Sequence, residues 1–129
     1  MNRMTPDQAK QWTGLKEGKL NRCPDMKNCV CSQHQDKFYI EPFKVAGDNP
    51  LYKVRQLVAS SDGYKIEADS GNYLHVTYTS GLMKFVDDVE FLAEPDKGLI
   101  HVRSASRLGY WDLGANRKRV EDLRKKLES

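Results

Sequence analysis

Apolar and polar residues alternate most regularly over residues 73–80, where Leu74, Val76 and Tyr78 alternate with polar side chains. A period of two is typical of a strand with one buried face. Less regular runs of the same kind occupy residues 64–69, 85–92 and 99–104, and segments containing Gly, Asn, Asp or Pro lie between successive runs. Because such segments favour tight turns, the pattern predicts a meander of four antiparallel strands.

Three other segments carry signals of a helix. Apolar residues over residues 51–61 fall on one face of a helix, and residues 115–127 carry a narrower apolar stripe. A threonine cap followed by Pro6 predicts a first helix that ends at Gly14.

These elements predict an α+β fold with an antiparallel sheet of about four to five strands and helices packed on one face. The chain is expected to form a single domain over residues 1–129. Residues 1–37 hold the N-terminal helix and a long cysteine-containing loop. Residues 38–129 hold a short edge strand containing Pro42, the second helix, the meander and the final helix.

The turn between the last two strands predicts their register. If Asp96 and Lys97 are its central residues, Glu90 lies opposite Arg103, and a slip of one residue would turn every side chain to the other face. The expected core face carries Phe85, Val89, Phe91, Ile100 and Val102. The expected opposite face carries Asp88, Glu90, His101 and Arg103.

Asp87 falls on the core face, so we expect it in or beside the core, where an unpaired carboxylate costs several kcal/mol. Its expected partners are Ser106, Arg107 and Arg117. Polar side chains are dense from this strand to the final helix, and they form the candidate ligand-binding site: Asp87, Asp88, Glu90, Arg103, Ser104, Ser106, Arg107, Asn116 and Arg117.

This candidate site has two interpretations besides catalysis. In the first, the carboxylates and arginines form a structural ion network that holds the final helix on the sheet. In the second, the arginines bind an anion, while Ser104, Ser106 and Asn116 add hydrogen bonds to a carboxylate, a phosphate or sugar hydroxyls. The start of the final helix would add its positive end.

Charge and composition exclude some classes of protein. The chain has 129 residues and a formal net charge of only +3, so nucleic acid is not an expected partner. It has no apolar run of the roughly 20 residues that a membrane span needs. The first ten residues lack the apolar centre of a secretory leader. No sequence motif indicates a cofactor or a catalytic metal.

Three cysteines lie close together in the loop and allow three chemistries. Cys23 and Cys29 can form a disulfide, with Cys31 outside the pair. Three thiols with His34 can bind zinc, although their spacing is not a recurring one. A catalytic thiolate is the third interpretation, and it requires a neighbouring base.

Four motifs along the chain resemble the domain-of-unknown-function 1499 family. They are CPD with NCV and SQ at residues 23–33, FVDDVEF at 85–91, RSASR at 103–107, and DLG with NRKRV at 112–120. The resemblance runs from about Leu20 to Leu127, and family members typically have Ser where this chain has Cys31. It implies no activity, because none is established for the family.

The resemblance also implies a place in the cell. Many bacterial members look like envelope proteins with a lipoprotein leader or a membrane segment, so we expect the periplasm, with a removed leader and a Cys23–Cys29 disulfide that persists. The expected function is a cell-envelope binding module for a small anionic or polyhydroxylated ligand or an envelope component. The alternatives are a hydrolytic enzyme that uses Asp or Glu with Arg, and a purely structural or interaction protein. A cytoplasmic location stays open.

Overall fold

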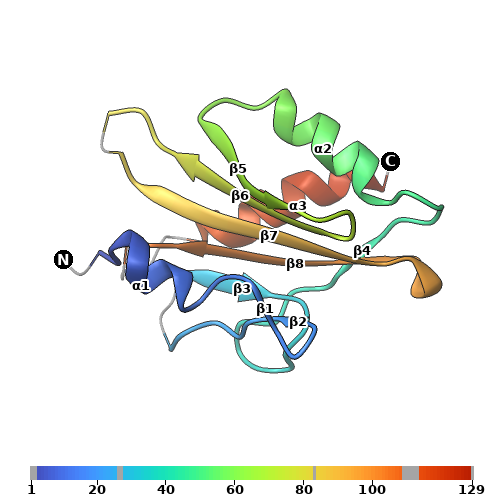
Figure 1. Ribbon diagram of the computed structural model, residues 1–129, viewed down its shortest axis with the longest axis horizontal. Helices are drawn as coiled ribbons and strands as arrows, with labels where there is room; N and C mark the ends of the chain where they lie inside the picture. Colours follow the sequence, from blue (N-terminus) through green and yellow to red (C-terminus); the bar gives the residue numbers. More distant parts are fainter. Residues whose placement is uncertain (1–2, 26–27, 83, 109–113, 129) are drawn as a thin grey trace.

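The computed structural model describes residues 3–25, 28–82, 84–108 and 114–128 (Figure 1). In chain order the elements are α1 (Pro6–Lys10), β1 (Leu15–Lys16), β2 (Lys19–Leu20), β3 (Cys29–Cys31), β4 (Phe43–Lys44), α2 (Leu51–Ala59), β5 (Tyr64–Asp69), β6 (Tyr73–Thr79), β7 (Val86–Glu94), the 3-10 turn η1 (Pro95–Lys97), β8 (Leu99–Ser106) and α3 (Ala115–Leu127).

The main sheet is antiparallel and has six strands, in the order β3-β8-β7-β6-β5 with β4 also paired to β8. The α+β class and the four-stranded meander are therefore confirmed. The sheet is larger than expected because β3 lies in the segment predicted as a loop. The three residues of β3 pair with Arg103, Ser104 and Ala105, on the side of β8 that faces away from β7.

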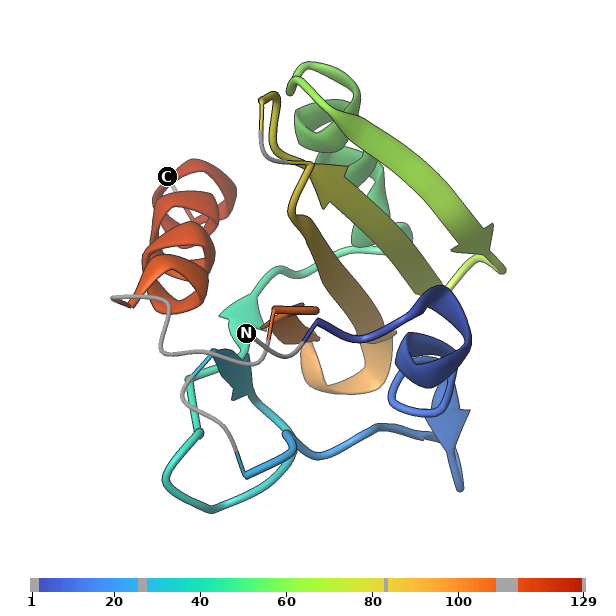
Figure 2. The same cartoon turned by 90° about the vertical axis from the view of Figure 1, so that its left-hand side faces the viewer.

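The sheet is covered on both faces. Figure 2 shows α2 and α3 on one side of the strands and α1 on the other. The larger core lies under α2 and α3, where Phe43, Val76, Phe91 and Val102 are fully buried. A smaller core on the opposite face contains Leu20, Cys23, Cys29, Cys31, Tyr73 and Ala105. The helices α2 and α3 share one face as predicted, and the N-terminal segment closes the other.

The predicted register of β7 and β8 is confirmed. Glu90 pairs with Arg103 and Phe91 with Val102. The turn between the strands ends at Gly98, whose φ of 65° is the left-handed conformation that glycine adopts without strain. The first helix is also confirmed at its start, where Thr5 and Gln8 form a capping box, but it ends at Lys10 and not at the predicted Gly14.

Cys23 and Cys29 form a disulfide with an S–S distance of 2.01 Å, as the first of the three interpretations predicts. Because two of the three thiols are joined, they do not form a three-thiol zinc site with His34. Cys31 remains a thiol, and burial raises its pKa, which is unfavourable for a catalytic thiolate.

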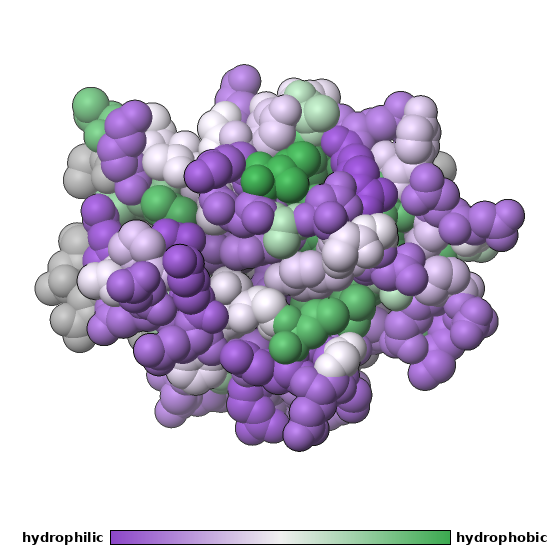
Figure 3. Space-filling view, viewed as in Figure 1, coloured by the Kyte–Doolittle hydropathy of each residue, from purple (hydrophilic) through white to green (hydrophobic). Residues whose placement is uncertain are grey.

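The surface in the view of Figure 3 is mainly hydrophilic, and hydrophobic groups appear there as small, separate patches. The exposed large apolar side chains among the described residues are Leu15, Tyr52, Tyr64, Ile66 and Leu82. Scattered exposure of this kind is ordinary for a folded domain. Within the described residues, no helix has the length and apolar character that crossing a bilayer requires.

Candidate functional site

The acidic strand β7 sends carboxylates to both faces of the sheet. Side chains alternate along a strand, so Asp88 and Glu90 share the face under the N-terminal segment, while Asp87 lies on the face of α3. The candidate residues are thus divided into two groups. The buried network lies on the N-terminal side, and a separate cleft lies on the side of α3.

Asp88 is the first centre of the buried network. It accepts two hydrogen bonds from Arg107, at 2.9 Å from Nε and 3.1 Å from Nη2. His75 Nε2 lies 2.8 Å from its Oδ1. Burial raises the pKa of Asp88, but the hydrogen bonds from His75 and Arg107 outweigh burial and lower the pKa below its ordinary value. Asp88 is therefore an ionised, tightly held carboxylate.

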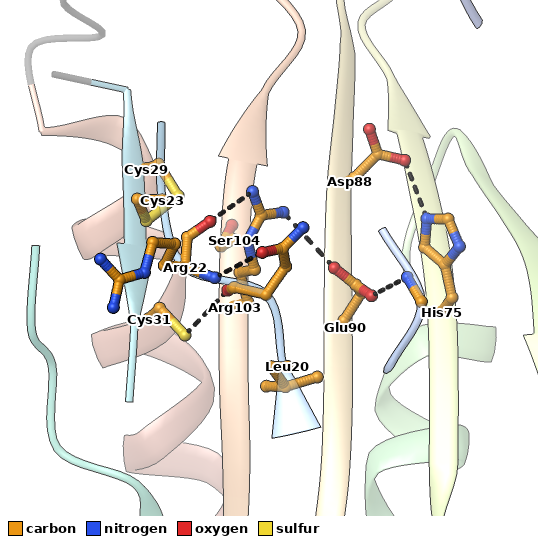
Figure 4. A network of polar contacts seen from close by, with 12 residues as sticks. Leu20, Arg22, Cys23, Cys29, Cys31, His75, Asp88, Glu90, Arg103 and Ser104 are labelled. Carbon is orange, nitrogen blue, oxygen red and sulfur yellow. Dashed lines mark hydrogen bonds and ion pairs between the residues drawn. A yellow bond between two sulfur atoms is a disulfide. The ribbon is translucent and has the colours of Figure 1, made fainter. Parts of the chain in front are cut away.

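Glu90 is the second centre of the network and is completely buried. It accepts hydrogen bonds from the Tyr73 hydroxyl at 2.5 Å and from the Gly14 backbone N–H at 2.8 Å. Arg103 Nη1 lies 3.4 Å from its other oxygen. Figure 4 shows Glu90 and Arg103 pointing toward each other from neighbouring strands. Burial raises the pKa of Tyr73, and the Glu90 charge raises it further, so the phenol stays a donor.

The buried network leaves no room for a ligand. Arg103 is only 1% exposed, and its Nη2 donates to the Arg22 carbonyl at 3.5 Å. Its Nε makes no hydrogen bond to any described residue. The cavity beside Asp88 and Arg103 measures about 10 Å³, which is on the scale of one water molecule. These charges therefore join the N-terminal segment to the sheet.

Asp87 belongs to a different group of contacts, formed with α3. Arg119 Nη2 donates to Asp87 Oδ2 at 2.6 Å, and its Nη1 donates to Asn116 Oδ1 at 2.8 Å and Ser104 Oγ at 3.1 Å. The same guanidinium lies 5.4 Å from the centre of the Tyr78 ring, within the range of a cation–π contact. The Asp87 side chain is 19% exposed, so it borders solvent as well as the core.

Asn116 connects α3 to the sheet and to the cysteine segment. Its Nδ2 donates to the Asn28 carbonyl at 2.8 Å and to Ser106 Oγ at 2.9 Å, and its Oδ1 accepts from Ser104 at 2.6 Å. Asn116 is 1% exposed, so these bonds compensate the burial of its amide. The amide fixes the start of α3, and with it the position of Arg119.

A cleft of about 450 Å³ opens beside the Asp87–Arg119 pair. Its lining includes Asp62, Tyr78, Phe85, Asp87, Ser106 and Arg119. The volume lies within the range of about 300–1,000 Å³ that is typical of small-molecule sites. We refer to this site as the α3 cleft. It combines two aromatic rings with carboxylates, a hydroxyl and a guanidinium.

The structure corrects the expected partners of Asp87. Arg107 points to the other face and binds Asp88, because it follows Ser106 on the alternating strand. Arg117 donates to the Tyr39 carbonyl at 3.2 Å. The arginine that reaches Asp87 is Arg119. The helical period of the sequence indicates that Arg119 is the partner. Arg119 follows Asn116 by three residues, so both side chains lie on the face of α3 that also carries Val120.

The nine candidate residues therefore lie in three places. Four belong to the buried network: Asp88, Glu90, Arg103 and Arg107. Four contact the α3 cleft or the Asn116 cluster beneath it: Asp87, Ser104, Ser106 and Asn116. Arg117 lies apart from both. Sequence reasoning missed Tyr73, His75, Tyr78 and Arg119, whose roles depend on the pairing of β6 with β7 and on the direction of α3.

No cluster of three or more His, Cys, Asp or Glu side chains suited to a metal ion occurs within the described ranges. The comparisons with known proteins give one match. The model of a family described as a protein of unknown function (DUF1499) matches residues 19–127. No curated protein and no solved structure matches the chain. The chain therefore belongs to the DUF1499 family.

Proposed function

We propose that this protein is a binding module for a small polyhydroxylated ligand, such as a saccharide unit, which it holds in the α3 cleft. The observation that carries the proposal is the position of the Asp87–Arg119 pair beside a cleft of about 450 Å³ with Tyr78 and Phe85 in its lining. Aromatic faces bury the apolar side of a sugar ring, and charged groups bind its hydroxyls.

Charge balance favours an uncharged ligand over an anion. Arg119 is paired with Asp87 in the cleft, so its charge is already neutralised. Asp62 adds a further negative charge to the lining. An incoming carboxylate or phosphate would meet two acids and one base in the lining; even with Arg3, which lies 5.0 Å from the centre of the Phe85 ring, the cleft has no net positive charge to attract it. Of the anionic and the polyhydroxylated ligands expected from the sequence, we therefore propose the second.

The cleft has polar atoms available for hydroxyl groups. Asp87 uses Oδ2 for Arg119, and its Oδ1 makes no hydrogen bond within the described part of the chain. Ser106 Oγ accepts from Asn116, which leaves its own proton free to donate. An acceptor and a donor side by side are the pair that vicinal hydroxyls require. Because Arg119 holds Asp87 in place, little side-chain entropy is lost on binding.

The hydrolytic alternative receives less support. It draws its acid and base from Asp87, Asp88 and Glu90, but Asp88 is 3% exposed and Glu90 0%, and both are engaged by donors. Asp87 is then the one member of the set that is accessible to a substrate, without a second carboxylate of the set to share the acid and base roles. The structural alternative describes the buried network well. It gives no reason for an aromatic cleft beside Asp87.

Titration with a panel of mono- and disaccharides tests the proposal, with glycerol phosphate as the anionic member. The proposal expects saturable binding of at least one neutral sugar, weakened about tenfold or more in Asp87→Asn. Asp69→Asn is the matched control, because it removes a carboxylate paired with Arg55 outside the cleft. Binding of glycerol phosphate alone, or equal loss in both variants, contradicts the proposal.

We also propose that the protein works in the bacterial cell envelope. The support is chemical, since a disulfide such as Cys23–Cys29 persists in oxidising compartments. Acid quenching of cells, followed by alkylation of the denatured protein with a mass-tagged maleimide before and after reduction, tests this location, because Cys31 is buried in the folded protein. The expected result is one reactive cysteine without reductant and three with it. Three reactive cysteines without reductant in freshly quenched cells would contradict an envelope location.

A further inference from the structure

A second constellation of polar residues lies at the opposite end of β8 from the α3 cleft. Ser32 directly follows β3, His101 is in β8, and Glu94 ends β7. Ser32 Oγ lies 3.1 Å from His101 Nδ1. On the other side of the ring, His101 Nε2 lies 2.5 Å from Glu94 Oε1. A hydroxyl, an imidazole and a carboxylate are thus connected in series.

With a neutral imidazole, this series has one direction of proton donation. Burial raises the pKa of Glu94, but the hydrogen bond from His101 outweighs burial and holds the pKa below its ordinary value. An ionised Glu94 accepts a hydrogen bond from Nε2, so in the neutral imidazole, the form that serves as a base, the proton lies on Nε2. His101 Nδ1 then carries a lone pair and accepts the proton of the Ser32 hydroxyl.

Ser32 is held in position without losing this proton. The Val102 backbone N–H donates to Ser32 Oγ at 2.8 Å, and the Ser32 backbone N–H donates to the Val102 carbonyl at 2.9 Å. The hydroxyl oxygen accepts one hydrogen bond and donates its proton to His101. One lone pair remains for a bond to an incoming carbon.

The three residues line a cavity of about 470 Å³. Ser32 is 4% exposed, and the side chains of His101 and Glu94 are 11% and 33% exposed. Lys19, Gln33 and Leu92 also line the cavity. A nucleophile that is largely buried, next to a base and at the edge of a cavity, is the arrangement that covalent catalysis by serine uses.

We propose that Ser32, His101 and Glu94 form a second site, in which Ser32 is the nucleophile for hydrolysis of small esters. Ser32 and His101 are catalytic residues, because they contact the reacting atoms. Glu94 is a positioning residue that holds the imidazole through Nε2, and no substrate contact is assigned to it. This site is independent of the α3 cleft, and either proposal can fail without the other.

The reaction proceeds in two balanced steps. Ser32 Oγ bonds to the ester carbonyl carbon while its proton moves to His101 Nδ1. The bond to the alcohol oxygen then breaks, and that oxygen takes the proton from Nδ1. In the second step, water attacks the acyl-serine and gives one proton to Nδ1. The proton returns to Ser32 Oγ as the bond to the acyl group breaks and the carboxylic acid leaves.

The cavity also provides a hydrogen-bond donor for the ester carbonyl oxygen, which becomes negatively charged when Ser32 attacks. Gln33 Oε1 accepts from the Leu20 backbone N–H at 2.7 Å, which fixes the amide plane. Its NH₂ group makes no hydrogen bond within the described part of the chain, and Gln33 lines the cavity next to Ser32. A fixed side-chain amide is a known type of oxyanion donor. The apolar Leu92 favours a short acyl chain.

A fluorophosphonate probe tests the nucleophile in the intact, disulfide-bonded protein. The proposal expects peptide mass spectrometry to find the adduct on Ser32, together with hydrolysis of p-nitrophenyl acetate above the rate in buffer. The rate of labelling should fall at least about 100-fold in His101→Gln, because the base is lost. His34→Gln is the matched control: it removes an imidazole that contacts the Leu20 carbonyl but keeps the base, so its labelling should fall far less than that of His101→Gln.

Ser32→Ala also removes the acceptor for Val102, so loss of folding could mimic loss of the nucleophile. Glu94→Gln avoids this problem because it leaves Ser32 and the strand pairing in place. It should lower kcat for p-nitrophenyl acetate about tenfold with KM unchanged, which a purely structural role would not do. No adduct on Ser32 in the wild type, or labelling unaffected by His101→Gln, overturns the proposal.

Discussion

Asp87 and Asp88 are neighbours in β7, yet they bind arginines on opposite faces of the sheet. Asp87 binds Arg119 of α3 at 2.6 Å, and Asp88 binds Arg107 at 2.9 Å beneath the N-terminal segment. The alternation of side chains along a strand requires this division. One short acidic motif therefore supplies both a structural ion network and one wall of a cleft.

Substitutions of Glu90 and Arg103 should have strongly non-additive effects on the free energy of unfolding. Glu90→Gln keeps an acceptor for Tyr73 but leaves the Arg103 charge buried without a counter-ion. Arg103→Met removes the cation and leaves the Glu90 charge buried without a counter-ion. Each variant should lose about 3 kcal/mol of unfolding free energy. The double variant should lose less than the sum by about 2 kcal/mol or more, as measured by urea unfolding. Additive losses would show that the two charges do not depend on each other.

Acid should destabilise the protein partly through Asp88. Its pKa is lowered in the folded state, so the unfolded chain binds this proton more tightly. The stability that Asp88 provides is complete above its ordinary pKa of about 3.9 and is lost as pH falls through the lower, folded value. Unfolding free energy measured from pH 6 to pH 2 should fall more steeply in the wild type than in Asp88→Asn. Equal slopes would contradict this.

Substitution by Ala should destabilise the protein more at Gly63 than at Gly71. Both have positive φ, at 73° and 86°, so Ala is strained at either position. A Cβ on Gly63 would also lie 2.7 Å from the Thr79 backbone oxygen, whereas Gly71 has open space. We expect Gly63→Ala to cost about 2–3 kcal/mol and Gly71→Ala about 1 kcal/mol in thermal or urea unfolding. Similar costs would indicate that β5 and β6 separate easily at this end.

The disulfide should stabilise the fold modestly, because it closes a short loop. Cys23→Ser should lower the free energy of unfolding by about 2 kcal/mol relative to the oxidised wild type. A reducing agent should lower the stability of the wild type by a similar amount and leave that of Cys23→Ser unchanged. Cys31→Ser is the control, since it retains the disulfide and should keep the response to reductant.

Local pattern was sufficient to predict the meander and its register. The turn at Asp96 and Lys97 connects adjacent strands, so the position of Glu90 opposite Arg103 follows from counting. The helix at 115–127 follows in the same way from its apolar stripe. Each of these predictions depends on residues that are close in sequence.

Long-range contacts could not be predicted in this way. The hydrogen bond from Gly14 to Glu90 joins residues 76 positions apart, and no period in the sequence reports how the N-terminal segment folds over the sheet. The strand Cys29–Cys31 lacks alternation because all its residues are buried. The partner of Asp87 depends on the rotation of α3 about its axis, which Asn116 fixes through tertiary contacts.

The most direct test of the division within β7 compares urea unfolding of Asp87→Asn and Asp88→Asn at pH 7. Asp88 is buried and bound by Arg107 and His75, so its variant should lose about 3 kcal/mol. Asp87 is partly exposed at the cleft, so its variant should lose about 1 kcal/mol or less. A loss at Asp87 equal to or larger than the loss at Asp88 would contradict the assignment of one carboxylate to the fold and the other to the cleft.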